Sequence, residues 1–233
     1  MTLRFGLQKT TLLDYPGRVA ALLFTAGCNF RCPYCHNPEL VTGGTPDNFL
    51  DFEEILSFLT KRRSVLGGVA ISGGEPLLQP ELPQAVSAIR ELGLSVKLDT
   101  NGSLPEALET VKPDFIAMDI KTSFSRYRRL LPEWADAKDL GNRMLESIKY
   151  ILKSGTPHEF RTTMVPGIVG PEDFDAILPL CQGAHSWVLS GFRNGVTLDH
   201  AYRQLSPYPE RVLNETARRI ETTGIPVRVR LNP

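Results

Sequence analysis

The fold of this chain is constrained most strongly by a regular alternation of strand-like and helix-like segments. Apolar stretches typical of buried strands are separated by amphipathic stretches whose apolar residues recur every three or four positions. The predicted strands span 19–25, 68–72, 95–99, 115–120, 158–163, 186–190 and 226–231, and the predicted helices span 51–62, 81–92, 104–111, 141–154, 172–181 and 209–223. Because the connections are short, this order predicts parallel strands joined by right-handed crossovers.

The first two predicted helices also carry end signals. Asp51 is placed to cap the N-terminus of the first helix, and Gly93 is typical of the residue that follows a helix C-terminus. In each helix the apolar residues share one face: Phe52, Ile55, Leu56 and Leu59 in the first, and Leu82, Val86, Ile89 and Leu92 in the second. This spacing supports the helix assignment of both segments.

Six strand–helix units are too few to close an eight-stranded barrel. We therefore predict an α/β fold arranged as an open partial (β/α)6 barrel, with chemistry at the C-terminal ends of the strands. The length of 233 residues fits one domain spanning 1–233, and 42% hydrophobic with 22% charged residues is typical of a globular chain. We find no internal repeat, low-complexity tract or obvious linker in the sequence.

Charge and hydropathy argue against several classes of partner. The 26 basic and 26 acidic side chains give a formal net charge of zero, which argues against a surface that coats nucleic acid. No apolar run approaches the length that spans a bilayer, and residues 1–6 do not resemble a signal peptide. We expect a cytoplasmic protein with reduced thiols and with neither a membrane nor a nucleic-acid partner, in which Cys181 is an ordinary buried thiol.

Three of the four cysteines, Cys28, Cys32 and Cys35, lie within eight residues in a C-x3-C-x2-C pattern that follows the first predicted strand. Three thiolates this close can hold one metal centre and leave one coordination position open, as in a four-iron cluster with one accessible iron. A structural zinc site takes four ligands, so the zinc alternative needs His36 or a distant residue as the fourth. On spacing alone both kinds of metal centre stay open.

The cysteine pattern, with Tyr34 before the last cysteine, resembles the cluster loop of the radical S-adenosylmethionine (SAM) superfamily. The run Gly73-Gly74-Glu75-Pro76, after another predicted strand, is similar to that superfamily's Gly-Gly-Glu-Pro motif. Within the superfamily the chain resembles the small activases of glycyl-radical enzymes, and most closely the group that activates anaerobic ribonucleoside-triphosphate reductases. The matching stretches are 13–17, 35–40, 99–102 and 118–121.

The resemblance implies an iron–sulfur enzyme with one [4Fe-4S] cluster, held by the three cysteines, whose open iron is chelated by SAM. One electron, from a low-potential donor such as flavodoxin or ferredoxin, then cleaves the carbon–sulfur bond of SAM and yields a 5′-deoxyadenosyl radical. In an activase, this radical removes a hydrogen atom from a backbone glycine of a large partner enzyme. The implied partner is therefore a glycyl-radical enzyme.

The resemblance also implies roles for the residues of the Gly-Gly-Glu motif. Gly73 and Gly74 would let the backbone approach the methionine amino group of SAM closely. Glu75 would accept a charge-assisted hydrogen bond from the same amino group. The alternative is an ordinary turn, since such sequences are common in turns.

Two acids end predicted strands, and they need partners because burying an unpaired charge is costly. By resemblance, Asp99 and Asp119 help bind a monovalent cation near the cofactor, Asp99 also contributes to the cofactor site, and Lys121 approaches the cofactor. The alternative is a structural ion pair between neighbouring strand ends.

Four further residues receive cofactor roles from the same resemblance. Asn101 would contact the ribose or carboxylate of SAM, and Arg161 would face the cofactor from the fifth strand. Tyr34 would stack near the adenine or shield the cluster, with simple packing as the alternative. His36 would tune the cluster through a hydrogen bond, with a loop-capping role as the alternative.

The chain departs from some activases after the sixth predicted strand, where they carry a histidine that contacts the cofactor. Residues 190–195 contain no histidine, so that either Arg193 or Asn194 replaces it or the contact is absent. This departure argues against the formate-lyase branch. The irregular segment 121–140, which contains Trp134, is either a solvated loop with a short helix or a surface that docks a protein partner.

Three other functions stay open at the level of sequence. The first is a radical SAM enzyme that acts on a small molecule such as a purine-like precursor, and the second is an activase of a pyruvate formate-lyase-like enzyme. The third is an iron–sulfur or zinc binding module without catalysis, which would not need Glu75, Asp99 or Lys121 at strand ends.

Overall fold

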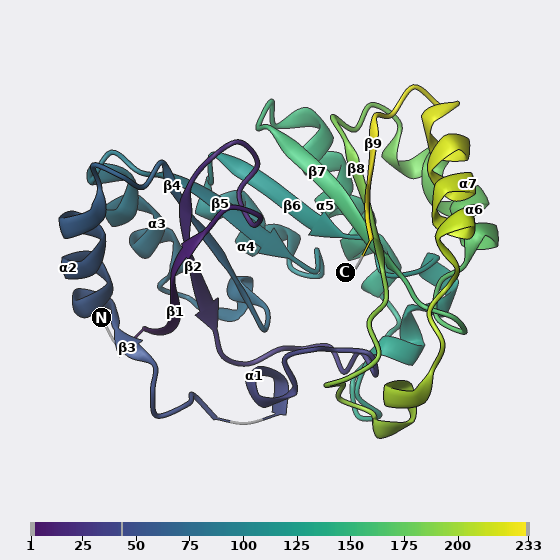
Figure 1. The fold of residues 1–233 in the computed structure, drawn as a ribbon, viewed down its shortest axis with the longest axis horizontal. Helices are drawn as coiled ribbons and strands as arrows, with labels where there is room; N and C mark the ends of the chain where they lie inside the picture. Colours follow the sequence, from purple (N-terminus) through teal and green to yellow (C-terminus); the bar gives the residue numbers. More distant parts are fainter. Residues whose placement is uncertain (1–2, 43, 232–233) are drawn as a thin grey trace. The chain divides into compact units, whose positions relative to one another are not determined.

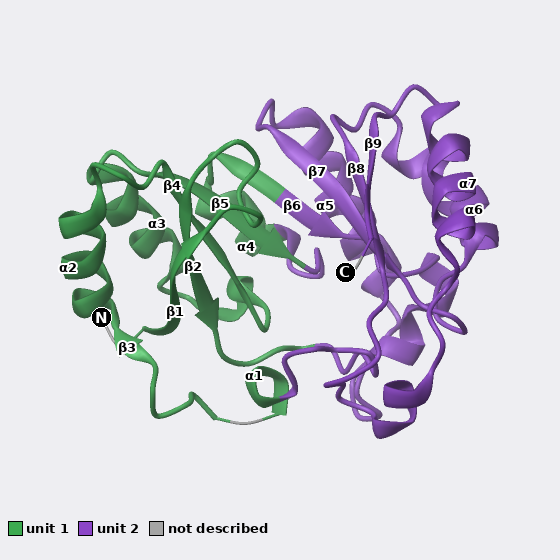
Figure 2. Ribbon diagram, viewed as in Figure 1, with its two compact units in different colours: residues 1–29, 39–100, 106–116 green, residues 30–38, 101–105, 117–233 purple. Residues whose placement is uncertain are grey.

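A computed structural model describes residues 3–42 and 44–231 of the chain. The chain forms two compact units, of which unit 1 contains residues 1–29, 39–100 and 106–116, and unit 2 contains residues 30–38, 101–105 and 117–233 (Figure 2). Each unit combines parallel strands with helices. The prediction that 1–233 is one domain stays a prediction.

Unit 1 contains five strands in the order β3-β1-β2-β4-β5 (Figure 1). Their bounds are β1 Arg4–Thr11, β2 Ala20–Thr25, β3 Leu50–Asp51, β4 Gly68–Gly73 and β5 Ser95–Thr100. Strands β2, β4 and β5 are parallel, whereas β1 pairs antiparallel with both β2 and β3. The helices are α1 Pro38–Thr42, which begins in unit 2, then α2 Phe52–Arg62, α3 Leu82–Glu91 and α4 Pro105–Val111, with a short 3₁₀ helix at Pro76–Leu78.

Unit 2 contains the parallel strands β7 His158–Met164, β8 Trp187–Gly191 and β9 Val227–Arg230, which pair in that order. Strand β6, Phe115–Asp119, begins in unit 1 and ends in unit 2, and it comes between β5 and β7 in the strand order. The helices are α5 Leu140–Lys153, α6 Phe174–Ile177 and α7 Glu210–Glu221, and 3₁₀ turns span Phe124–Leu130, Pro171–Asp173, Leu178–Cys181 and His200–Gln204. Helix α7 packs along β8 and β9 (Figure 1).

The core of unit 2 is organised around Trp187 on β8, whose side chain is fully buried. Its ring lies 5.7 Å from the ring of Phe160 and 5.8 Å from that of Phe174, between centroids. The indole N–H donates to Thr162 Oγ1 over 3.2 Å, which satisfies the one polar atom of this side chain. These contacts pack β7, β8 and α6 into one apolar cluster.

All seven predicted strands are present, and five of the six predicted helices are confirmed. The helix predicted at 172–181 is wrong as a continuous element, because it is divided into two 3₁₀ turns around the short helix α6. Pro179 has no backbone N–H to donate, which removes one helical hydrogen bond from this segment. Strands β1 and β3 were not predicted.

The predicted helix end signals are confirmed. Asp51 precedes α2, and its backbone N–H donates to Glu54 Oε2 over 3.0 Å, as in a capping box. Gly93 adopts a φ of 80° directly after α3, in the left-handed region that favours glycine. Leu56 and Leu92 are only partly buried, so the buried faces of both helices are narrower than predicted.

Two other predictions can be compared with the structure. Cys181 is a fully buried free thiol, and burial raises its pKa well above the usual range, as expected for an ordinary core cysteine. Within residues 3–42 and 44–231, no helix is long and apolar enough to cross a membrane.

Candidate active site

The three clustered cysteines lie on the loop that follows β2, and we name residues 28–37 the cysteine loop. None of the three forms a disulfide; Cys32 is buried, and the other two are partly buried. Cys28 belongs to unit 1, whereas Cys32 and Cys35 belong to unit 2, where the backbone N–H of Cys35 donates to the carbonyl of Cys32 over 3.0 Å. The donor set of three thiols outside any disulfide fits an iron–sulfur cluster. Among the described residues, the structure groups no three His, Cys, Asp or Glu side chains closely enough to hold a metal ion.

In unit 1, the Gly-Gly-Glu motif lies directly against the chain that enters the cysteine loop. The backbone N–H of Gly74 donates to the Thr25 carbonyl (2.9 Å), and that of Glu75 donates to the Gly27 carbonyl (2.8 Å). A Cβ atom on Gly73 would lie 2.5 Å from Thr25 backbone atoms, and one on Gly74 would lie 1.9 Å from the Gly27 carbonyl oxygen. The two glycines therefore allow two backbone segments to touch, and their predicted approach to the SAM amino group stays a prediction.

Glu75 connects the ends of two neighbouring strands. Its side chain is fully buried, and Oε1 accepts hydrogen bonds from the Leu77 backbone N–H (3.1 Å) and from Thr100 Oγ1 (2.8 Å). The first bond caps the 3₁₀ helix after β4, and the second reaches the last residue of β5. Sequence analysis did not identify Thr100, although a hydroxyl at the end of the adjacent parallel strand is a natural donor for a buried carboxyl group.

Replacing Thr100 with valine is expected to lower the free energy of unfolding by about 1–2 kcal/mol, because a buried carboxyl oxygen loses a donor without a change of side-chain shape. Urea unfolding followed by circular dichroism measures the loss. Thr60→Val, on the exposed face of α2, is the matched control and is expected to change stability by less than about 0.5 kcal/mol. Equal effects of the two substitutions would contradict the structural role of this hydrogen bond.

Asp99 has a partner on its own strand. Lys97 Nζ contacts Asp99 Oδ1, and the two side chains are only 1% and 9% exposed. Residues two apart on a strand share a face, so this pairing follows directly from the geometry of β5. Sequence analysis predicted an ion pair between neighbouring strand ends as one alternative for Asp99, whereas the pair observed here lies within one strand. The predicted role of Asp99 in binding a cation or the cofactor stays a prediction.

Asn101 follows β5 and belongs to unit 2. Its Oδ1 accepts from the backbone N–H of Ser103 (2.9 Å) and from Ser103 Oγ (2.6 Å), which is an Asx turn. The observed role is thus to shape the loop after β5, and contact with SAM stays a prediction.

Three predicted site residues of unit 2 come together. Asp119 ends β6, and its two oxygens bind Arg161 Nε on β7 (2.8 Å) and Lys121 Nζ (3.0 Å). The backbone supports this contact, since the N–H of Ile120 donates to the Arg161 carbonyl over 2.8 Å. The side chains of Asp119, Lys121 and Arg161 are 29%, 18% and 20% exposed. The result is a partly buried group of two cations and one anion at the C-terminal end of β6.

The charges in this group stabilise one another's ionised forms. Burial alone would raise the pKa of Asp119, but the Arg161 guanidinium and the Lys121 ammonium outweigh it and hold the pKa well below the usual range. Burial would lower the pKa of Lys121, but Asp119 outweighs it and raises the pKa well above the usual range. All three side chains are therefore charged at neutral pH, and the group carries one net positive charge.

Replacing Asp119 with asparagine is expected to lower stability at pH 7 by about 2 kcal/mol, because two partly buried cations lose their counter-charge. The folded pKa of Asp119 is depressed, so its contribution is fully present above the unfolded pKa of about 3.9 and is lost as pH falls through the folded pKa. The difference between wild type and Asp119→Asn should therefore be constant down to about pH 5 and shrink below about pH 4. Urea midpoints across this range measure it.

The matched control for this substitution is Asp175→Asn, because Asp175 also pairs with an arginine, Arg219, but its side chain is 75% exposed. Exposed pairs contribute little, so we expect less than about 0.5 kcal/mol at every pH. A loss for Asp119→Asn that did not change below about pH 4 would contradict the ionised state assigned to Asp119.

Two residues of the cysteine loop, Tyr34 and His36, pack within unit 2. Tyr34 is buried, and burial together with nearby Cys32 raises the pKa of its phenol well above the usual range, so the ring packs as a neutral group. His36 Nδ1 lies 2.8 Å from the Val196 carbonyl oxygen, and its ring stacks on Phe192 with centroids 6.0 Å apart. The loop-capping alternative for His36 thus has direct structural support, and tuning of a cluster stays a prediction.

The segment after β8 contacts the cysteine loop in a way that sequence analysis did not predict, although it considered Arg193 and Asn194 of this segment as cofactor contacts. In addition to the contacts of His36, the backbone N–H of Leu198 donates to the Cys35 carbonyl (3.0 Å), and that of Asp199 donates to the Pro33 carbonyl (2.9 Å). The stretch 192–199 therefore lies along the second half of the cysteine loop. No local sequence pattern predicts a contact between segments that lie about 160 residues apart in the chain.

The irregular segment 121–140 contains a 3₁₀ turn at Phe124–Leu130, and hydrogen bonds anchor it within unit 2. Buried Asp173 accepts from Ser123 Oγ and Arg126 Nη1, both over 2.7 Å. The backbone N–H of Arg31 in the cysteine loop donates to the Leu130 carbonyl over 2.7 Å. Trp134 in the same segment is 80% exposed. Docking of a protein partner on this segment stays a prediction.

Comparison with family models matches residues 22–179, more than half of the chain, to the Radical SAM superfamily. The matched range contains the cysteine loop, the Gly-Gly-Glu motif and the Asp119 group. The chain belongs to the radical SAM superfamily. Membership implies a [4Fe-4S] cluster and SAM as cofactors, and it identifies the protein as an enzyme of this superfamily.

Similar proteins agree with this assignment. MJ1227 of Methanocaldococcus jannaschii, provisionally named a glycyl-radical enzyme activating enzyme, is 30% identical over 218 residues, which are 90% of this chain and 88% of the relative. A pyruvate formate-lyase-activating enzyme of Staphylococcus aureus is 31% identical over 158 residues, which are 66% of this chain but only 57% of that enzyme. A radical SAM methyltransferase from Sphaerobacter thermophilus has a TM-score of 0.73 and 16% identity, covering 95% of this chain and 69% of that structure. The predicted α/β fold class of the radical SAM type is confirmed.

Proposed function

We propose that this radical SAM enzyme is an activase of a glycyl-radical enzyme, and that its partner is an anaerobic ribonucleoside-triphosphate reductase. The observation that carries the activase role is the 30% identity to MJ1227 over 90% of this chain. The choice of the reductase as the partner rests on the resemblance of 13–17 and 35–40 to the group that activates such reductases. The substrate is then a protein, and the reacting group is one backbone glycine.

In this proposal the residues of the chain hold and orient the cofactors. Cys28, Cys32 and Cys35 hold the cluster as thiolates. With SAM bound and an electron from reduced flavodoxin or ferredoxin, the cofactors supply the radical that takes one hydrogen atom from the glycine. Lys121 and Arg161 present positive charge at the C-terminal end of β6 that would favour binding of an anionic group of SAM, and Asp119 keeps both side chains in place.

An activase of a pyruvate formate-lyase-like enzyme is the second candidate, supported by the 31% identity to the Staphylococcus aureus enzyme. That match covers 66% of this chain, compared with 90% for MJ1227. The absence of a histidine in residues 190–195 also argues for the first candidate.

Electron paramagnetic resonance tests the proposal. The protein is reconstituted anaerobically with iron and sulfide and mixed with a reductant, SAM and the anaerobic ribonucleotide reductase of the same organism. A glycine-centred doublet on the reductase is the expected result. A doublet only with a formate-lyase-like enzyme would support the second candidate. Deoxyadenosine release without a doublet on either protein would overturn the activase role and favour a small-molecule substrate.

A further inference from the structure

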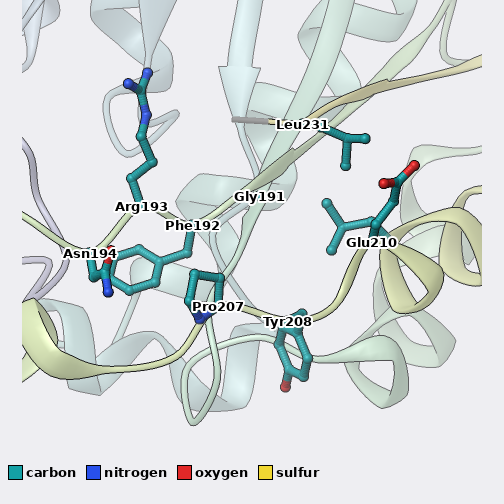
Figure 3. A pocket seen from close by; sticks show the side chains of 9 residues that line it. Gly191, Phe192, Arg193, Asn194, Pro207, Tyr208, Glu210 and Leu231 are labelled. Carbon is teal, nitrogen blue, oxygen red and sulfur yellow. The ribbon is translucent and has the colours of Figure 1, made fainter. Parts of the chain in front are cut away.

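An open pocket of about 450 Å³ lies in unit 2, at the C-terminal end of β8 (Figure 3). One wall is formed by residues 191–194, which end β8 and follow it, and the other by residues 207–213, which lead into α7. Leu231, directly after β9, completes the lining. In parallel α/β folds, the carboxyl ends of strands are where ligands bind, so the position is that of a functional site.

One residue that lines the pocket also packs against the cysteine loop. Phe192 lines the pocket and also stacks on His36, with ring centroids 6.0 Å apart. The residues that follow Phe192 also contact the cysteine loop. The Val196 carbonyl oxygen lies beside the His36 ring, and the Leu198 backbone N–H donates to the Cys35 carbonyl. A molecule bound in the pocket therefore lies beside the second half of the cysteine loop.

The lining combines apolar walls with a few polar groups. Phe192 and Leu213 are buried, while Arg193, Asn194 and Glu210 are exposed and offer a cation, an amide and an anion. Sites for small molecules bury most of the ligand's surface. Here the polar residues form an exposed rim, so the pocket suits one part of a larger molecule whose other parts are held elsewhere. An extended peptide matches this mixture, since its backbone offers both donors and acceptors and its side chains reach the apolar wall.

The pocket also lies outside the part of the chain that the superfamily shares. The family model ends at residue 179, and every lining residue follows it. Residues that distinguish one substrate from another are expected outside the common cofactor-binding region, because the superfamily uses the same cofactors on different substrates.

We propose that this pocket binds the segment of the protein substrate that flanks the reacting glycine, with Phe192 as the apolar contact and with Arg193 and Glu210 selecting its polar groups. Arg193 pairs with a carboxylate or carbonyl oxygen of that segment, and Glu210 pairs with a basic side chain or a backbone N–H. The inference rests on the proposed function, because it takes a protein as the substrate.

Kinetics of glycyl-radical formation on the anaerobic ribonucleotide reductase give the first test. Arg193→Ala and Glu210→Gln are each expected to raise the KM for the reductase about tenfold, with kcat changed less than about twofold, as for residues that bind a substrate uniformly. The matched controls are Arg211→Ala and Glu215→Ala, which alter exposed residues of α7 that do not line the pocket. Wild-type KM values for both pocket variants would overturn the proposal.

Hydrogen exchange gives a second test that does not depend on turnover. Adding the reductase is expected to slow exchange in peptides covering 191–195 and 206–213. A pocket of about 490 Å³ in unit 1, lined by residues of α3 and of the C-terminal end of α4, serves as the internal reference and should not change. Protection of 206–213 by SAM alone would overturn the proposal, because the pocket would then belong to the cofactor. If the wild-type protein forms a glycyl radical on the reductase but neither 191–195 nor 206–213 is protected, the pocket assignment fails while the activase role stands. If the wild-type protein forms no glycyl radical on any partner, the activase role itself fails.

Discussion

Serine in place of Cys28, Cys32 or Cys35 is expected to abolish cluster binding and the cleavage of SAM. A serine hydroxyl is not ionised at neutral pH and is a poor ligand for iron in place of a thiolate. A site with only three protein ligands has no spare donor, so one loss is enough to remove the cluster. After anaerobic reconstitution, iron and acid-labile sulfide per protein should fall by about tenfold or more. Deoxyadenosine release should fall to background.

The fourth cysteine supplies the control. Cys181 is a fully buried free thiol whose pKa is raised by burial, so it remains protonated and has no part in the cysteine loop. Cys181→Ala should bind the same amount of iron as wild type and lose only about 1 kcal/mol of stability. A full complement of iron in Cys32→Ser would overturn the assignment of Cys32 as a cluster ligand.

The strands that carry the site could be predicted because their signals are local. Strands β2 and β4 are largely apolar runs, as expected where both faces of a parallel sheet are covered. Strand β5 is buried along most of its length although it also contains Lys97 and Asp99. Strand β1 was not predicted because residues 8–10 are exposed, so that it lacks both a continuous run and clean alternation. Its existence depends on antiparallel pairing with β2, which is a tertiary contact.

The same distinction applies to the site. Asp119, Lys121 and Arg161 were each predicted as site residues by resemblance, but the ion pairs that join them were not predicted. The neighbouring strands β6 and β7 bring these side chains together, which is a tertiary contact. The pairing of Lys97 with Asp99 could have been found, from the two-residue period of a strand. The stacking of His36 on Phe192 could not, since nothing local to either residue indicates the other.

Replacing Gly74 with alanine is the second substitution that we expect to have a large effect. The effect should be mainly on the stability of the fold. The added Cβ would lie 1.9 Å from the Gly27 carbonyl oxygen and 2.6 Å from the Gly27 carbonyl carbon. Both are backbone atoms and cannot rotate away, so one of the two segments must move. The hydrogen bond from the Glu75 N–H to Gly27 would then be lost. We expect the free energy of unfolding to fall by about 3 kcal/mol, measured by urea unfolding of the protein without cluster.

Gly44→Ala is the matched control, because a Cβ at Gly44 would meet no atom within 4 Å and should change stability by less than about 0.5 kcal/mol. The displaced segment leads directly into Cys28, so Gly74→Ala should also lower iron incorporation, whereas Gly44→Ala should not. If Gly74→Ala folds with wild-type stability but binds less iron, the glycine serves the cofactor site alone. If stability and iron binding fall together, the close contact between these two segments is what places the first ligand of the cysteine loop.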